Sequence, residues 1–152
     1  MVVAARGVAE MDQILRFVVE HMGFLWVGAR FRIADSEVTT INGGNAFLVL
    51  ESSAIRVRVV RDRGQLILEM QSRFATGTRW IGGEIVYRLL RGAKPSSDLL
   101  DEDLAAFLGT DLEAIEDVFG VGQWQATYLK AKEIERARSR ELWHPIGQAG
   151  LM

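Results

Sequence analysis

The fold is decided by residues 46–71, which read AFLVLESSAIRVRVVRDRGQLILEMQ. Three runs in this stretch, 46–50, 55–60 and 65–71, have the composition of β-strands, and the polar linkers between them are short enough for hairpins. The second and third runs alternate between apolar and polar residues, as a strand with one buried face does. The stretch therefore predicts the centre of an antiparallel meander.

A four-residue loop over 61–64 sets the expected register of the second hairpin. The pairs that this loop places on one apolar face are Val59 with Leu66, Val57 with Leu68, and Ile55 with Met70. On the opposite face the same register brings Arg56 across from Glu69, an oppositely charged pair. The hairpin is thus expected to bury one face and to carry charge on the other.

The first strand of the stretch, 46–50, is apolar on both sides. Whichever way it faces, either Phe47 and Val49 or Leu48 and Leu50 must lie on the second face of the sheet. Strands of this kind are usually covered on both faces. Two alternatives follow: the chain's own helices cover the second face, or that face is a docking surface for a partner.

Before this stretch the sequence predicts a helix and one or two further strands. Apolar residues at helical spacing predict a helix over 8–22, which ends at Gly23. From 24 to 33 the period changes to two, which predicts a strand; its apolar side comprises Leu25, Val27, Ala29, Phe31 and Ile33. A short strand over 37–41 and a turn at Asn42–Asn45 can follow, giving four or five strands in all.

The second half of the chain is helical. Expected helices cover Gly83–Arg91, a segment capped by Ser97 or Asp98, Asp111–Phe119, and 123–142. Elements grouped by type rather than alternating predict an α+β fold, in which three or four helices pack on an antiparallel sheet. We expect one domain over 1–152, with a helix-and-sheet part (1–72), a helical half (80–142) and a tail from Trp143 that forms no element.

Composition excludes several classes of chemistry. The chain has 152 residues, is 49% apolar and 25% charged, and contains no Cys and two His. The lack of Cys excludes disulfide scaffolds, Cys-ligated zinc and thiol catalysis. No apolar run approaches the roughly 18 residues of a membrane helix, and the first residues are too few for a signal-peptide core. A cytoplasmic protein is expected.

No motif predicts catalysis. Residues 77–84 have the glycine spacing of a P-loop, but Gly83 and Glu84 stand where Lys and Ser/Thr are needed. His21 and His144 lie at a helix end and in the tail, and no nucleophile elbow is present. We therefore expect no catalytic residues, no metal, no cofactor and no enzymatic activity.

The charge distribution indicates a binding function. Residues 56–94 hold nine Lys or Arg against three acids, whereas 96–122 hold eight acids and no base. The acids expected to bind Lys or Arg of a partner protein are Asp101, Asp103, Glu113, Glu116 and Asp117. The alternatives are a solvated helical face, or acids that pair internally with residues such as Arg88 and Arg91. Nucleic acid is a less favoured partner, because the acidic segment would repel its backbone.

Two further functions stay open at the level of sequence. A homodimer or larger scaffold could bury the second sheet face with Trp124, Tyr128 or Trp143 against its copy. A small-ligand or enzymatic site could form between sheet and helices around Arg79, Trp80 and Glu84.

Residues 11–71 resemble a known class of proteins. The segments that carry the resemblance are HMGF at 21–24, FLVLESS at 47–53 and IRVRVVRD at 55–62. They are similar to small bacterial proteins that include immunity proteins of contact-dependent and polymorphic toxin systems. The resemblance implies a non-enzymatic cytoplasmic protein that binds and blocks a cognate toxin. It transfers no functional residue, since immunity proteins keep a scaffold and vary the contact surface.

Overall fold

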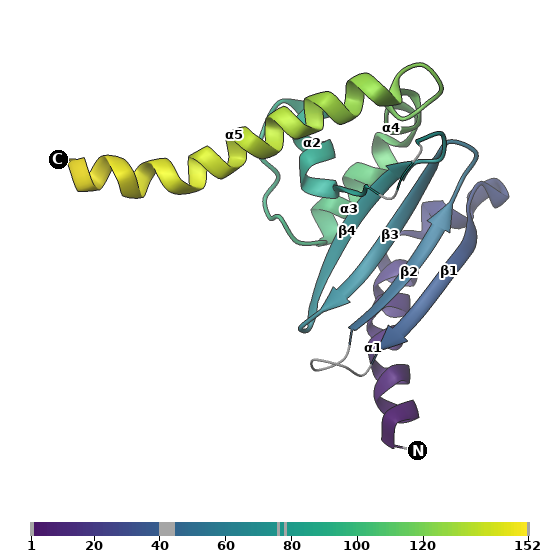
Figure 1. The fold of residues 1–152 in the computed structure, drawn as a ribbon. Helices are drawn as coiled ribbons and strands as arrows, with labels where there is room; N and C mark the ends of the chain where they lie inside the picture. Colours follow the sequence, from purple (N-terminus) through teal and green to yellow (C-terminus); the bar gives the residue numbers. More distant parts are fainter. Residues whose placement is uncertain (1, 40–44, 76, 78, 152) are drawn as a thin grey trace.

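The chain folds as an α+β structure in the predicted order of helix, sheet and helices (Figure 1). The computed structural model describes residues 2–39, 45–75, 77 and 79–151, with the side chains of 9–39, 45–75, 77 and 79–141. The helices are α1 (Val2–His21), the 3₁₀ segment η1 (Gly23–Ala29), α2 (Gly83–Arg91), α3 (Glu102–Thr110), α4 (Leu112–Val118) and α5 (Trp124–Leu151). The strands are β1 (Arg32–Thr39), β2 (Asn45–Glu51), β3 (Ile55–Asp62), β4 (Gln65–Ser72) and β5 (Ile81–Gly82).

The five strands form one antiparallel sheet in sequential order, β1-β2-β3-β4-β5. The strands predicted over 46–50, 55–60 and 65–71 are confirmed, each within two residues of its observed ends. The turn predicted at Asn42–Asn45 lies almost entirely outside the described residues, of which Asn45 begins β2.

The predicted register of the β3–β4 hairpin was wrong by two residues. Arg63 and Gly64 form a tight turn, with φ of 53° and 80°, and Asp62 pairs with Gln65. Two central residues with positive φ match the twist of the flanking strands better than a four-residue loop does. The observed pairs are therefore Val59 with Leu68, Val57 with Met70, and Ile55 with Ser72. Because the shift is even, each residue keeps its predicted face.

The strand predicted over 24–33 was also wrong. Residues 23–29 form the kinked segment η1, in which Gly28 and Ala29 have positive φ, and the strand begins only at Arg32. Leu25 and Phe31 are buried as expected, but Val27 and Ile33 are 71% and 56% exposed. The alternation in the sequence thus arises from two separate buried side chains, Leu25 and Phe31, which lie on either side of a chain reversal. Of the short strand expected over 37–41, residues 37–39 end the longer strand β1, and 40 and 41 lie outside the described residues.

The hydrophobic core lies between the helices and one face of the sheet, the inner face. Ile14 and Val18 of α1 and Met22, which follows the helix, are fully buried, and α1 packs on β1, β2 and β3. The buried inner-face residues of the sheet include Leu48, Leu50, Val57, Val59, Leu68 and Met70. Figure 1 shows α1, α3 and α4 behind the sheet and α2 beside β4. No described helix covers the opposite, outer face, so the alternative that the chain's own helices cover both faces was wrong.

The helical half departs from prediction at two boundaries. Asp101, rather than Ser97 or Asp98, caps α3, and its carboxylate accepts a hydrogen bond from Leu104 N at 2.8 Å. The chain before Asp101 is irregular, and Leu100 N donates to Leu66 O of β4 at 2.9 Å. At the other end, α5 continues to Leu151, so the tail predicted from Trp143 is helical. Extending an existing helix needs no new nucleus, which offsets the poor propensity of Pro and Gly there.

Ion pairs dock α5 onto α2 and its neighbours. Arg138 binds Glu84 of α2 at 3.2 Å and Asp98 at 2.7 Å. Arg88 of α2 binds Glu141 at 3.4 Å. No helix within the described residues is both long and apolar enough to cross a membrane.

Candidate functional site on the uncovered sheet face

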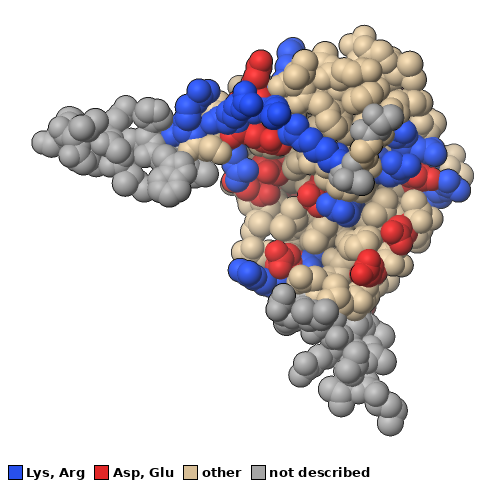
Figure 2. All heavy atoms as spheres, viewed as in Figure 1, with Lys and Arg blue, Asp and Glu red and all other residues tan. Residues whose placement is uncertain are grey.

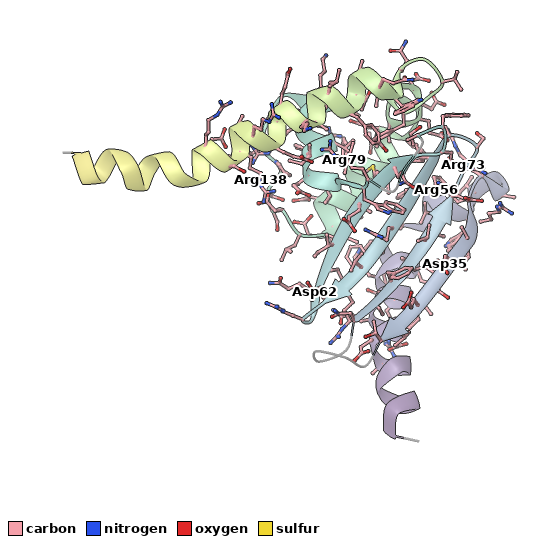
Figure 3. All side chains as sticks on the ribbon, viewed as in Figure 1. Asp35, Arg56, Asp62, Arg73, Arg79 and Arg138 are labelled. Carbon is pink, nitrogen blue, oxygen red and sulfur yellow. The ribbon has the colours of Figure 1, made fainter. Side chains whose placement is uncertain are left out.

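The outer face of the sheet carries a hollow of about 500 Å³ between β1 and the chain that follows β4. The polar and aromatic residues that line it are Arg32, Asp35, Glu51, Arg56, Gln71 and Trp80. Figure 2 views this face, and basic side chains gather at the end of the sheet where Figure 3 labels Arg56 and Arg73. The hollow is the candidate functional site.

Strand register builds the floor of the hollow. Arg32 pairs across β1 and β2 with Glu51, Glu51 pairs with Arg56 of β3, and Arg56 pairs with Gln71 of β4. Residues that oppose one another in antiparallel strands share a face, so these four side chains form one row across the outer face. Arg56 donates to Gln71 Oε1 at 3.2 Å, which continues the row as a chain of hydrogen bonds.

Glu51 is the centre of the row and is only 6% exposed. Arg32 Nε donates to its Oε1 at 2.9 Å and Arg56 Nε to its Oε2 at 3.3 Å, while Arg73 Nε lies 3.7 Å from Oε2. Burial alone would raise the pKa of the Glu51 carboxyl, but the bonds from Arg32 and Arg56 and the charge of Arg73 hold that pKa below its ordinary value. Glu51 is therefore a carboxylate that anchors three guanidinium groups.

The cluster leaves positive charge at the surface. Three guanidinium groups share the Glu51 carboxylate, and with Asp35, which also lines the hollow, an excess of one positive charge remains. The side chain of Arg32 is 73% exposed, and that of Arg56 is 35% exposed. Planar guanidinium groups bind carboxylate and phosphate oxygens in pairs. The hollow can therefore accept an anionic group.

Trp80 and the chain before it form the wall of the hollow. Gln71 Nε2 donates to Gly77 O at 3.4 Å and to Arg79 O at 3.3 Å, which ties this chain to β4. The guanidinium of Arg58 stacks 4.3 Å above the Trp80 ring and also binds Glu69 at 2.8 Å. An apolar wall beside a cationic floor suits a ligand with an anionic group next to an apolar one.

The five acids predicted to bind a partner do not form one set. Asp101 caps α3, and Glu116 is 9% exposed, accepts a hydrogen bond from Ser52 Oγ at 2.8 Å and pairs with Arg30. Asp103 accepts from Ser96 Oγ at 3.0 Å. Glu113 and Asp117 are exposed, and neither side chain contacts a charged partner among the described residues.

Internal pairing also accounts for other acids of the segment 96–122. Asp111 binds Arg91 at 3.1 Å, and Asp98 binds Arg138 at 2.7 Å. The alternative that these acids close internally therefore explains much of the segment. Asp103, Glu113 and Asp117 are the predicted residues that a partner could still reach at the surface.

The residues of the other two hypotheses are also dispersed. Arg79 binds Glu135 of α5 at 2.8 Å, and Glu84 is buried beside Arg138, whereas Trp80 faces the hollow. Burial raises the pKa of the Glu84 carboxyl, against the opposing charge of Arg138. Trp124 and Tyr128 contact each other at 5.6 Å between ring centroids. The side chain of Trp143 lies outside the described set.

Sequence reasoning missed Arg32 and Glu51. In the sequence, Arg32 falls at the end of a misassigned strand, and Glu51 falls in a predicted hairpin linker. Glu51 is an acid with arginines on the neighbouring strands. Only the correct β1–β2 register places Arg32 opposite Glu51, so the site could not be found without that register. Among the described residues, no three His, Asp or Glu side chains converge to hold a metal ion. None of the comparisons with family models, curated proteins and solved structures finds a match.

Proposed function

We propose that this protein is a non-enzymatic protein-interaction module that binds an acidic segment of another protein in the hollow on its outer sheet face. The observation that carries the proposal is the sharing of one buried carboxylate, Glu51, by three arginines at an otherwise uncovered surface. A carboxylate of the partner would bind Arg32 and Arg56 and lie against Trp80. Arg and Trp are the residue types that most often dominate binding energy at protein interfaces.

The proposed biological form of this binding is inhibition of a toxin, in keeping with the resemblance of residues 11–71 to immunity-type proteins. Many hydrolytic active sites rely on carboxylates as metal ligands or as acid and base. An arginine-rich surface that covers such carboxylates would block substrate access. The exposed acids Asp103, Glu113 and Asp117 would then contact basic groups at the rim.

Reversing the charge of Arg32 is expected to remove binding in the hollow. The probe is a capped peptide that pairs Glu with Leu, titrated while the Trp80 indole and Arg Nε resonances are followed by NMR. We expect Arg32→Glu to weaken binding by about tenfold or more, because it removes a bidentate donor and places a like charge beside the peptide.

Arg63→Glu is the matched control, since the Arg63 side chain is 87% exposed on the β3–β4 turn and lies outside the hollow. It makes the same charge change and is expected to alter affinity by less than about twofold. Equal losses in the two variants would show that only net charge matters and would contradict the proposed site.

The inhibitory form has a genetic test. Co-expression with a toxin encoded beside this gene is expected to restore growth, and Arg32→Glu is expected to abolish that protection while Arg63→Glu retains it. Protection that survives Arg32→Glu but is lost on reversing Asp103, Glu113 and Asp117 together would instead place the contact on the acidic surface. If no toxin is encoded nearby, or if the unaltered protein gives no protection, the proposal of toxin inhibition is contradicted. The binding site in the hollow is then tested by the peptide titration alone.

A further inference from the structure

The free edge of β1 is a second surface with the features of a binding site. β1 is the first strand of the sheet, so only β2 pairs with it, and no other described strand lies against its outer edge. Residues 32–38 are all exposed. The edge of a sheet presents unpaired backbone N–H and C=O groups, to which an extended segment can add as a further strand. In β1 the register shifts between Ile33 and Asp35, and Ser36 N donates to Asp35 Oδ1 at 2.8 Å.

The side chains beside this edge are apolar on the inner face. Ile33 and Val38 oppose the inner-face residues Leu50 and Ala46, yet both are exposed because no described element lies beyond them. On α1, which covers this side of the sheet, Leu15 and Val19 are exposed as well.

The helical periodicity of α1 places Leu15 and Val19 on the flank of the helix that is nearer to the free edge of β1. Gln13, on the opposite flank of the helix, hydrogen-bonds Gly64 O and the side chain of Arg61 at the β3–β4 turn. Residues two and six positions further along a helix lie on the other flank, towards β1. The edge of β1 therefore has an apolar shelf beneath it, formed by α1.

On the outer face the same edge is acidic. Asp35 and Glu37 oppose Val49 and Phe47 of β2, and no basic side chain among the described residues forms an ion pair with either. Figure 3 labels Asp35 on β1, on the face towards the viewer. A second copy of the chain is disfavoured here, because a two-fold pairing centred on Ser36 sets Asp35 opposite Glu37, and like charges directly opposite destabilise a sheet.

We propose that the β1 edge binds an extended segment of a partner protein in which Lys or Arg alternates with apolar residues. The basic residues would face Asp35 and Glu37, and the apolar residues would cover Val38 and the α1 shelf. A period of two matches both requirements at once, since successive strand residues point to opposite faces. The two sites adjoin at Asp35, which also lines the hollow, but their occupants differ, because the hollow would bind an anionic group and the β1 edge a basic extended segment.

The test uses a labelled nine-residue peptide that alternates Lys with Val, and a control peptide of the same composition with its lysines grouped at one end. Binding is measured by fluorescence anisotropy, and strand addition by hydrogen exchange of the β1 amides. We expect the alternating peptide to bind and to protect β1 amides, and the grouped peptide to protect none. The Asp35→Lys/Glu37→Lys variant should bind at least about tenfold more weakly.

Glu113→Lys/Asp117→Lys is the matched control, since it reverses two exposed acids on another surface. It should change affinity by less than about twofold. Equal losses in the two double variants, equal binding of the grouped peptide, or binding without protection of β1 amides would each overturn the proposal. A dimer of the unaltered protein in light scattering that Asp35→Lys/Glu37→Lys disrupts would also overturn it, by making a second copy the occupant.

Discussion

Glu51→Gln is expected to destabilise the protein by about 2 kcal/mol at pH 7, because buried hydrogen bonds to a charged group are among the costly ones to lose. Gln keeps the shape of the side chain but cannot balance the guanidinium groups of Arg32, Arg56 and Arg73. Urea unfolding followed by circular dichroism measures the difference. Glu37→Gln is the control, since Glu37 is exposed on the same face, and it should change stability by less than about 0.5 kcal/mol.

The pH dependence of this loss distinguishes charge from shape. The pKa of Glu51 in the folded protein lies below the ordinary value of 4.5, so its contribution is fully present above that value and disappears as the pH falls through the lowered pKa. The difference between the two proteins should therefore shrink on acidification below about pH 4. A loss that stays constant from neutral to acidic pH would mean that Glu51 acts through packing alone.

Phe119→Ala is expected to destabilise the protein by about 4 kcal/mol, more than Glu51→Gln does, because removal of a fully buried aromatic ring leaves a cavity. The Phe119 ring packs edge-on against Tyr128 at 6.0 Å, and its carbonyl accepts a hydrogen bond from the buried Ser72 Oγ at 2.5 Å. The Tyr128 hydroxyl in turn accepts from Ser72 N at 3.2 Å and donates to Arg79 O at 3.4 Å.

The same substitution should loosen the wall of the hollow, since the chain leading to Trp80 is held through these contacts. Thermal unfolding measures the stability loss, and the line width of the Trp80 indole resonance reports on the wall. Phe74→Ala, at an exposed ring, is the control and should cost less than about 1 kcal/mol. A comparable loss in both variants would mean that Phe119 does not occupy the core.

The fold was predictable where local pattern and tertiary packing agree. The strands of residues 46–71 and helix α2, which Gly92 ends with a φ of 67°, follow directly from period and from turn residues. Prediction failed at 24–33, where a chain reversal at Gly28 and Ala29 mimics the alternation of a strand. It failed again at the β3–β4 turn, because Arg63 adopts a left-handed conformation that residue type alone does not indicate.

The candidate site was less predictable than the fold. Arg32, Glu51 and Arg73 are far apart in sequence and meet only through the register of three strands and the loop after β4. The acidic segment was recognisable in the sequence as a run of acidic residues. The run itself does not indicate which acids are unavailable to a partner because they cap a helix, as Asp101 does, or are buried, as Glu116 is. Those assignments depend on partners such as Arg30 that come from a different part of the chain.

The sequential strand order also bears on how the molecule is made. Each of β2, β3 and β4 pairs with the strand synthesised immediately before it, so no pairing has to wait for a distant segment. Residues 2–72 can thus assemble α1 and four strands while the C-terminal half is still in the ribosome. During that interval β4 is an open border of the nascent sheet. The short strand β5 and the Leu100 contact to Leu66 later close it, which leaves β1 as the one long border still open in the described part of the finished protein.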